Sequence, residues 1–143
     1  RFFSDLKLDE EVTLGNPTLE NIMYNPTTKQ IKFIDLYEES MIDSKLLDYS
    51  MILQCSNSYY GFINDRDVFV NNEKVSHNLS IPLSLKSFSK SFERLLPNDY
   101  IDIIKIFELT QFLRMLPFKL LAGEIEKAKF FYAHACYLYS KIF

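Results

Sequence analysis

Residues 14–36 read LGNPTLENIMYNPTTKQIKFIDL, and this stretch decides the expected fold. Two short apolar runs, at positions 21–24 and 31–36, flank the turn-forming residues NPTTKQ at 25–30. Short apolar runs on either side of Asn, Pro and Thr are typical of paired strands joined by a turn. The stretch therefore predicts a β-hairpin.

After this hairpin the apolar residues recur at helical intervals from Ser44 onward. The apolar face of this first helix is expected to comprise Ile42, Leu46, Tyr49 and Leu53. The polar run at 56–58 ends it. Residues 59–82 leave two alternatives open, a second hairpin around the sequence NNE at 71–73 or an extended loop.

Proline and capping residues set the expected bounds of the later helices. Ser84 would cap a helix that Pro97 stops, because proline lacks a backbone N–H and clashes with the preceding turn. Asn98 would cap the next helix, which Pro117 kinks or ends. A last helix begins at Glu124. Its expected apolar stripe comprises Ile125, Ala128, Tyr132, Ala135, Leu138, Tyr139 and Ile142.

The length and order of these elements limit the architecture. The chain has 143 residues, 48% of them apolar and 24% charged, which predicts a single globular domain spanning residues 1–143. Strands that precede the helices cannot form a doubly wound sheet with them. The expected fold class is α+β, mainly helical, with the hairpin on a helical platform.

Charge and cysteine content exclude several classes of partner. A net charge of -3 has the wrong sign for a nucleic-acid-binding protein. No apolar run approaches the roughly 18 residues of a membrane span. Cys55 and Cys136 lie in apolar helical patterns without metal-ligand spacing and are expected to be small buried hydrophobic residues. Two thiols make no disulfide framework, so a cytoplasmic location is expected.

Three motifs together resemble the aminoglycoside phosphotransferase and choline kinase family. They are LGNPTLENIMY at 14–24, IKFID at 31–35 and LLDYS at 46–50. In that family an H-G-D-x-x-x-x-N loop leads into a strand, a second strand ends in Ile-Asp, and a helix bearing Asp follows. RMLP at 114–117 resembles the end of a later family helix. The resemblance implies the C-terminal lobe of a protein-kinase-like fold, with the hairpin carrying the catalytic loop.

The resemblance also assigns roles to individual residues. Asn21 and Asp35 match the family's metal ligands, and Asp48 matches the helix acid that holds the backbone of the catalytic loop. The implied cofactors are Mg²⁺ and ATP, and the implied substrate is a sugar, amino sugar or choline-like acceptor that receives phosphate on a hydroxyl. The chemistry agrees, since Mg²⁺ prefers oxygen ligands and a hairpin can bring Asn21 and Asp35 together.

The catalytic loop departs from the family pattern at two of three positions. Leu14 and Asn16 stand where the family has His and Asp, and Asn16 occupies the position of the general base. A carboxamide is not a usable base, and general-base catalysis contributes roughly 10²–10⁴-fold to a rate. The sequence therefore predicts a weakened or inactive phosphotransferase. The alternative is a pseudokinase-type domain that binds or scaffolds without catalysis.

The rest of the family's machinery is expected to lie outside this chain. Nothing before Leu14 is long enough to supply the N-terminal lobe that covers the nucleotide. We therefore expect the chain alone to be inactive as a kinase and to need an upstream N-terminal lobe or a partner chain. A third interpretation is a structural helical domain in which the motifs are accidental.

Several other polar or aromatic residues have a functional and a structural interpretation. The acidic residues between 38 and 43 could attract a cationic acceptor, but such a cluster is more often a solvated loop. Tyr59 and Tyr60 could stack on a quaternary amine or a sugar, although core packing is more frequent. His77 and His134 lack a partner acid or nucleophile at a recognisable spacing and are expected to be structural.

Overall fold

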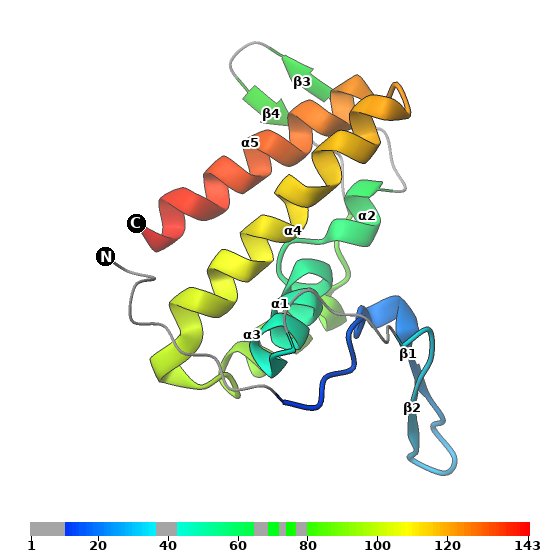
Figure 1. Cartoon of the computed structure of the whole chain (residues 1–143). Coiled ribbons are helices and arrows are strands. Elements are labelled where there is room, and N and C mark those ends of the chain that lie inside the picture. Colours follow the sequence, from blue (N-terminus) through cyan, green and yellow to red (C-terminus); the bar gives the residue numbers. More distant parts are fainter. Residues whose placement is uncertain (1–10, 37–42, 65–68, 72–73, 77–79) are drawn as a thin grey trace.

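A computed structural model describes residues 11–36, 43–64, 69–71, 74–76 and 80–143. The described part is α+β and mostly helical, as the sequence predicts, with two separate two-stranded antiparallel sheets (Figure 1). The elements are η1 (Leu19–Asn21), β1 (Ile22–Tyr24), β2 (Ile31–Phe33), α1 (Lys45–Ser56), α2 (Tyr60–Asn64), β3 (Phe69–Asn71), β4 (Lys74–Ser76), α3 (Leu83–Glu93), η2 (Asn98–Tyr100), α4 (Ile101–Leu121) and α5 (Ile125–Ile142).

The predicted first hairpin is confirmed. Strands β1 and β2 pair antiparallel, with Ile22 opposite Phe33. The Asn25 side chain closes the turn, because its Oδ1 accepts hydrogen bonds from the backbone N–H groups of Thr27 at 2.9 Å and Thr28 at 3.1 Å. The hairpin extends away from the helices at the lower right of Figure 1, and most residues of its strands are exposed. The expectation that it lies on a helical platform is therefore wrong.

Helix α1 is the predicted first helix and lies at the centre of the molecule (Figure 1). Ser44 caps it, with its side chain accepting the backbone N–H of Leu46 at 3.3 Å. Eight of its twelve residues are buried, so it is enclosed on most sides and not only along one stripe. Leu46 and Leu53 belong to a buried cluster completed by Leu96, Ile103 and Ile104.

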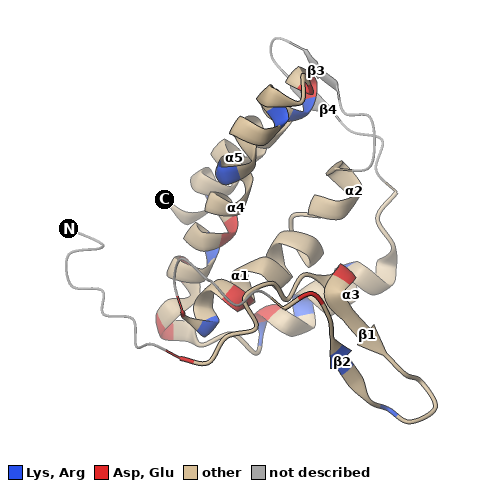
Figure 2. Cartoon of the chain, turned by 45° about the vertical axis from the view of Figure 1, so that its right-hand side comes forward, with Lys and Arg blue, Asp and Glu red and all other residues tan. Residues whose placement is uncertain are grey.

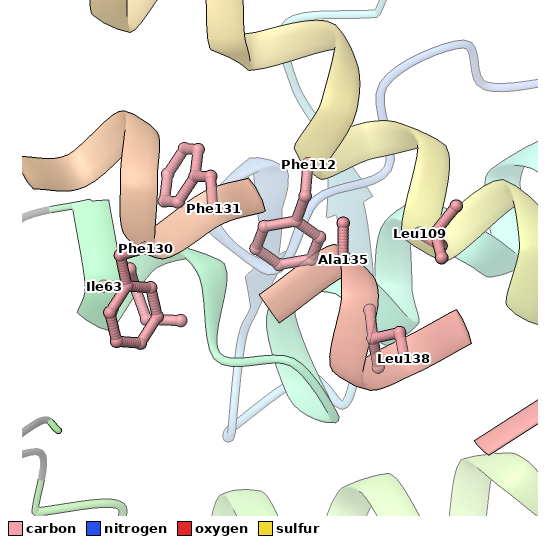
Figure 3. Close-up of a cluster of buried hydrophobic side chains, with 7 residues drawn as sticks. All are labelled: Ile63, Leu109, Phe112, Phe130, Phe131, Ala135 and Leu138. Carbon is pink, nitrogen blue, oxygen red and sulfur yellow. The ribbon is translucent and has the colours of Figure 1, made fainter. Parts of the chain in front are cut away.

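Helices α4 and α5 form an antiparallel pair (Figure 1). Gly123, with φ +73°, makes the turn between them, and Lys119 Nζ lies 2.7 Å from Glu124 Oε2 across it. A second hydrophobic cluster lies between this pair and α2 (Figure 3). It comprises Ile63, Leu109, Phe112, Phe130, Phe131, Ala135 and Leu138.

The helix bounds correct two expectations, on Ser84 and Asn98, and exclude one of the two alternatives at Pro117. α4 continues through Pro117 instead of ending there. Pro117 lies one turn before the end of the helix and removes one hydrogen bond, whose acceptor belongs to the exposed residue Leu113. Neither Ser84 nor Asn98 caps a helix: Pro82 precedes α3, and Asn98 begins the 3₁₀ turn that leads into α4.

The buried face of α5 also differs from the predicted stripe. Ile125, Tyr132 and Tyr139 are exposed. The adjacent residues Phe130 and Phe131 are buried instead, because the face that meets α4 and α2 takes the most apolar rings and leaves the tyrosine hydroxyls in water. Cys136 is likewise exposed, contrary to expectation, whereas Cys55 is buried as expected.

Between α1 and α3 the structure decides between the two alternatives, a hairpin or an extended loop, in favour of the hairpin. β3 and β4 do pair antiparallel, with Val70 opposite Val75, so the hairpin forms. The short helix α2 before it was not expected. His77 and the acidic residues up to 42 lie outside the described residues, and Asp43 is exposed.

Candidate functional site

The backbone at Leu14 and Gly15 is held by one carboxylate of α1. Asp48 Oδ2 accepts the backbone N–H of Leu14 at 2.7 Å, and Oδ1 accepts that of Gly15 at 3.1 Å. Gly15 has φ +74°, a conformation that glycine adopts without strain, and this allows two successive N–H groups to meet one carboxylate. Burial raises the pKa of Asp48, while the two N–H groups act in the opposite direction.

The hairpin brings Asn16, Asn21 and Asp35 together. Asn21 Nδ2 donates to the backbone oxygen of Asn16 at 3.0 Å, and Asn16 Nδ2 lies 3.5 Å from both Oδ2 and the backbone oxygen of Asp35. The backbone oxygen of Asn21 also accepts the N–H of Ile34 at 2.9 Å, which continues the strand pairing to the residue before Asp35. These three side chains, called here the Asn16–Asp35 cluster, thus lie at the open end of the hairpin.

The donor set of this cluster fits a weakly held Mg²⁺. Asp35 is exposed and supplies a carboxylate. Asn21 donates its Nδ2–H to the backbone oxygen of Asn16, and no described donor bonds to its Oδ1. Two protein oxygens with the remaining positions filled by water and phosphate are typical of Mg²⁺ sites in phosphotransferases. Within the described ranges no three His, Cys, Asp or Glu side chains gather as a metal site.

The Asn16 side chain works against acid–base chemistry. Its amide group points a donor at Asp35 and carries no titratable proton at neutral pH. Asn16 therefore supplies no general base at the position that the resemblance assigns to one, and Asp35 is the only carboxylate among the three members of the cluster.

We expect Asp48→Ala to destabilise the protein by roughly 2–3 kcal/mol, because it removes two hydrogen bonds to a carboxylate and leaves two backbone N–H groups without a partner. Urea unfolding measures the loss, and amide hydrogen exchange shows where it arises. Asp48→Asn, which keeps one acceptor oxygen, should lose less. Unchanged exchange at Leu14 and Gly15 in the Ala variant would contradict the assigned contact.

A second polar site was missed by the sequence analysis. Glu108 lies in α4 with 1% of its surface exposed and accepts hydrogen bonds at Oε1 from Asn57 Nδ2, at 3.0 Å, and from Ser58 Oγ. Burial raises its pKa to about 7, more than the hydrogen bonds from Ser58 and Asn57 lower it. The available signal was the position of Glu108 four residues after Ile104 and four residues before Phe112, which places it on the same apolar side of the helix.

The two tyrosines after α1 take different roles. Tyr60 packs edge-on against Phe112, with ring centroids 5.9 Å apart, so it is a core residue. Tyr59 has φ +57° and lines a pocket beside Glu108. The His134 ring packs against Phe112 at 4.8 Å between centroids, in keeping with the structural role that the sequence predicts.

Comparison of the chain with known proteins and structures assigns it to no family. No family model, no curated protein and no solved structure matches the chain. Figure 2 shows both basic and acidic residues along α4 and α5. No helix in the described ranges has the length and apolar content needed to cross a bilayer.

Proposed function

We propose that the chain is the C-terminal lobe of an ATP- and Mg²⁺-dependent small-molecule phosphotransferase of the aminoglycoside phosphotransferase and choline kinase type. Asn21 and Asp35 would hold Mg²⁺, Asn16 would occupy the position of the base, and Asp48 would fix the loop. Mg²⁺ would neutralise charge on the transferred phosphate, whereas the protein residues position it. The acceptor would be a small polar molecule with a hydroxyl group.

One observation carries this proposal. The Asp48 carboxylate, in α1, hydrogen-bonds to the backbone of Leu14 and Gly15, which lie 34 and 33 residues before it in the sequence. A turn or a cap needs no such contact, because local hydrogen bonds satisfy turns. A loop that must present Asn16 beside Asp35 at a fixed position does need it, because a displacement of about 1 Å strongly reduces phosphoryl transfer.

A hollow beside η1, the 3₁₀ turn that ends at Asn21, offers space for an acceptor. It has a volume of about 510 Å³ and is bordered by Leu19 and Glu20 of η1 and by Gly61, Phe62 and Phe88. Gly61 leaves room for the Glu20 carboxylate, since a Cβ there would come within 2.6 Å of Glu20 Oε1. An apolar wall with one carboxylate suits a small molecule that carries hydroxyl or amino groups.

The decisive experiment restores the family residues. We expect Leu14→His with Asn16→Asp, made in the full-length protein, to raise acceptor-dependent ATP turnover by roughly 10²–10⁴-fold, because a carboxylate replaces the amide at the base position. Asn16→Asp also places a second carboxylate about 3.5 Å from Asp35, which a divalent cation relieves. If the wild type has a measurable rate and the double variant has the same rate, the role given to Asn16 is wrong.

The alternative, a pseudokinase-type binding domain, is favoured by the donor role of Asn16 in the Asn16–Asp35 cluster. Calorimetry with Mg²⁺ and ATP separates the two proposals. The pseudokinase is supported if Asp35→Asn weakens the binding of Mg²⁺ and ATP. It also requires that no phosphate is released, even after Leu14→His and Asn16→Asp. Asp102→Asn, an exposed acid at the start of α4, is the matched control. Absence of any Asp35-dependent nucleotide binding would contradict both proposals.

A further inference from the structure

A second hollow lies at the other end of α1 from the Asp48 contact. Asp48 is in the first turn of the helix and Asn57 is its C-cap, and nine residues of helix correspond to about 14 Å of rise. The hollow has a volume of about 810 Å³, within the range of small-molecule sites. Its walls come from the segment after α1, the end of α3, and the facing sides of α4 and α5. None of its lining residues belongs to the Asn16–Asp35 cluster.

The interior of this hollow, called here the Glu108 pocket, presents an acceptor oxygen. Both hydrogen bonds to Glu108 end on Oε1, from Asn57 and Ser58, and no described donor occupies Oε2. Glu93 adds a second carboxylate from the last residue of α3. A ligand that enters must therefore bring a hydrogen-bond donor, and an ammonium group fits best because the bond is then charge-assisted at both ends.

The pocket also carries cationic side chains. Lys105, one helical turn before Glu108 on α4, and Lys141, near the end of α5, both line it. Two lysines balance two carboxylates, so the pocket has no large net charge of either sign. This arrangement disfavours a simple cation or a simple anion and suits a ligand with one charge of each sign.

The remaining walls are largely aromatic. Phe130, His134 and Tyr137 follow one another along α5, and Tyr59 faces them from the segment after α1. The surface of these rings is attractive to cations and to flat apolar groups: Lys141 Nζ already lies 5.2 Å from the centroid of the Tyr137 ring. An aromatic body would pack between these rings with offset or edge-on geometry.

We propose that the Glu108 pocket binds a small zwitterion with an aromatic body, the chemical class of an aromatic amino acid. The ammonium group would bond to Glu108 Oε2 with Glu93 nearby, and the carboxylate would meet Lys105 and Lys141. The site is independent of the proposed phosphotransfer. Its position at the end of α1 makes it a separate binding site and not the acceptor hollow beside Glu20.

The first test uses L-phenylalanine as the probe. Its binding is detected by ¹H–¹⁵N NMR titration of the chain. We expect shifts confined to amides around the Glu108 pocket. 2-Phenylethylamine lacks the carboxylate and 3-phenylpropionate lacks the ammonium group, so each should bind at least about tenfold more weakly. Equal affinity for all three molecules, or no binding at about 10 mM, would overturn the proposal.

Variants locate the two charged contacts. Glu108→Gln keeps an acceptor for Asn57 and Ser58 but places an amide N–H₂ where the ammonium group would sit, so affinity should fall at least about tenfold. Lys141→Gln should weaken L-phenylalanine and leave 2-phenylethylamine nearly unchanged. Glu126→Gln, an exposed acid on α5, is the control and should bind normally. Normal binding by Glu108→Gln would contradict the assigned contact.

The pH dependence gives a third readout. Only the ionised Glu108 attracts an ammonium group, and its pKa is about 7, so affinity should rise about tenfold between pH 6 and pH 8. The titratable and charged groups that face Glu108 in the pocket are Tyr59, Glu93, Lys105, His134, Tyr137 and Lys141. Glu108→Gln retains all of them and should lose the slope. An equal slope in both proteins would assign the titration to another group and overturn the ammonium contact.

Discussion

Phe112→Ala is expected to lower the free energy of unfolding by about 3–5 kcal/mol, the largest stability effect of any single substitution considered for this chain. Phe112 is fully buried at the centre of the cluster in Figure 3. Its ring meets Phe131 edge-on, with centroids 5.5 Å apart and planes at 89°, and Tyr60 at 5.9 Å. Truncation leaves a cavity between three helices that cannot collapse without moving α5.

A matched control exists on the same helix. Phe118 is 64% exposed, so Phe118→Ala should change stability by no more than about 0.5–1 kcal/mol. Urea or thermal unfolding of both variants measures the difference. Similar losses in the two proteins would show that α5 does not pack on Phe112 as described.

Glu108 is expected to make the protein more stable in mild acid than at pH 8. Its pKa is about 7 in the folded chain against an ordinary value of 4.5, so between these values the folded form binds a proton that the unfolded form has released. The stabilisation is complete below pH 4.5 and is lost as the pH rises through about 7. It corresponds to about 3 kcal/mol, because burial penalises the ionised carboxylate.

Glu108→Gln isolates this contribution. The amide cannot ionise, so the stability of the variant should exceed that of the wild type at pH 8 and the difference should shrink or reverse at pH 5. Other carboxyl groups, including Asp48 with its raised pKa, are common to both proteins and cancel in the comparison. Chemical unfolding at several pH values measures it. Parallel stability profiles would mean that the Glu108 carboxyl group is hydrated in the folded chain.

Elements with a local signature could be predicted from the sequence. The first hairpin follows from two apolar runs around an Asn-Pro turn, and the turn is closed by Asn25, a residue of that same segment. Helix α1 follows from the spacing of its apolar residues from Ser44 onward, and in the structure Ser44 caps it. In both, the residues that define the bounds hydrogen-bond to their own neighbours, so tertiary structure does not override them.

Features set by distant partners could not be predicted. Phe130 and Tyr132 are both aromatic residues of the same helical segment, and the spacing in α5 alone does not show which of them faces α4 and α2. Pro117 is tolerated because of its place near the end of α4, which the sequence did not define. Such positions are decided by packing, which carries no periodic signal of its own.

The candidate site divides in the same way. The family resemblance named Asp48, Asn16, Asn21 and Asp35. In the structure Asp48 and Asn21 hydrogen-bond to the backbone of the loop, and the Asn16 side chain lies beside the Asp35 carboxylate. Glu108 was missed because no motif marks it and because its partners, Asn57 and Ser58, lie 51 and 50 residues before it in the sequence. Only the folded chain shows that a lone acid is enclosed there.

The backbone at Asp35 limits which amino acids can ever occupy that position. Its φ of +53° is in the left-handed region, where Gly, Asn and Asp are tolerated and branched or bulky residues are strained. Among substitutions that remove the carboxylate, Asn and Gly are therefore the ones that this backbone conformation tolerates, and either replacement would leave the hairpin intact. A lineage could lose the chemistry of this position long before it lost the shape, which makes conservation of shape a poor guide to activity in its descendants.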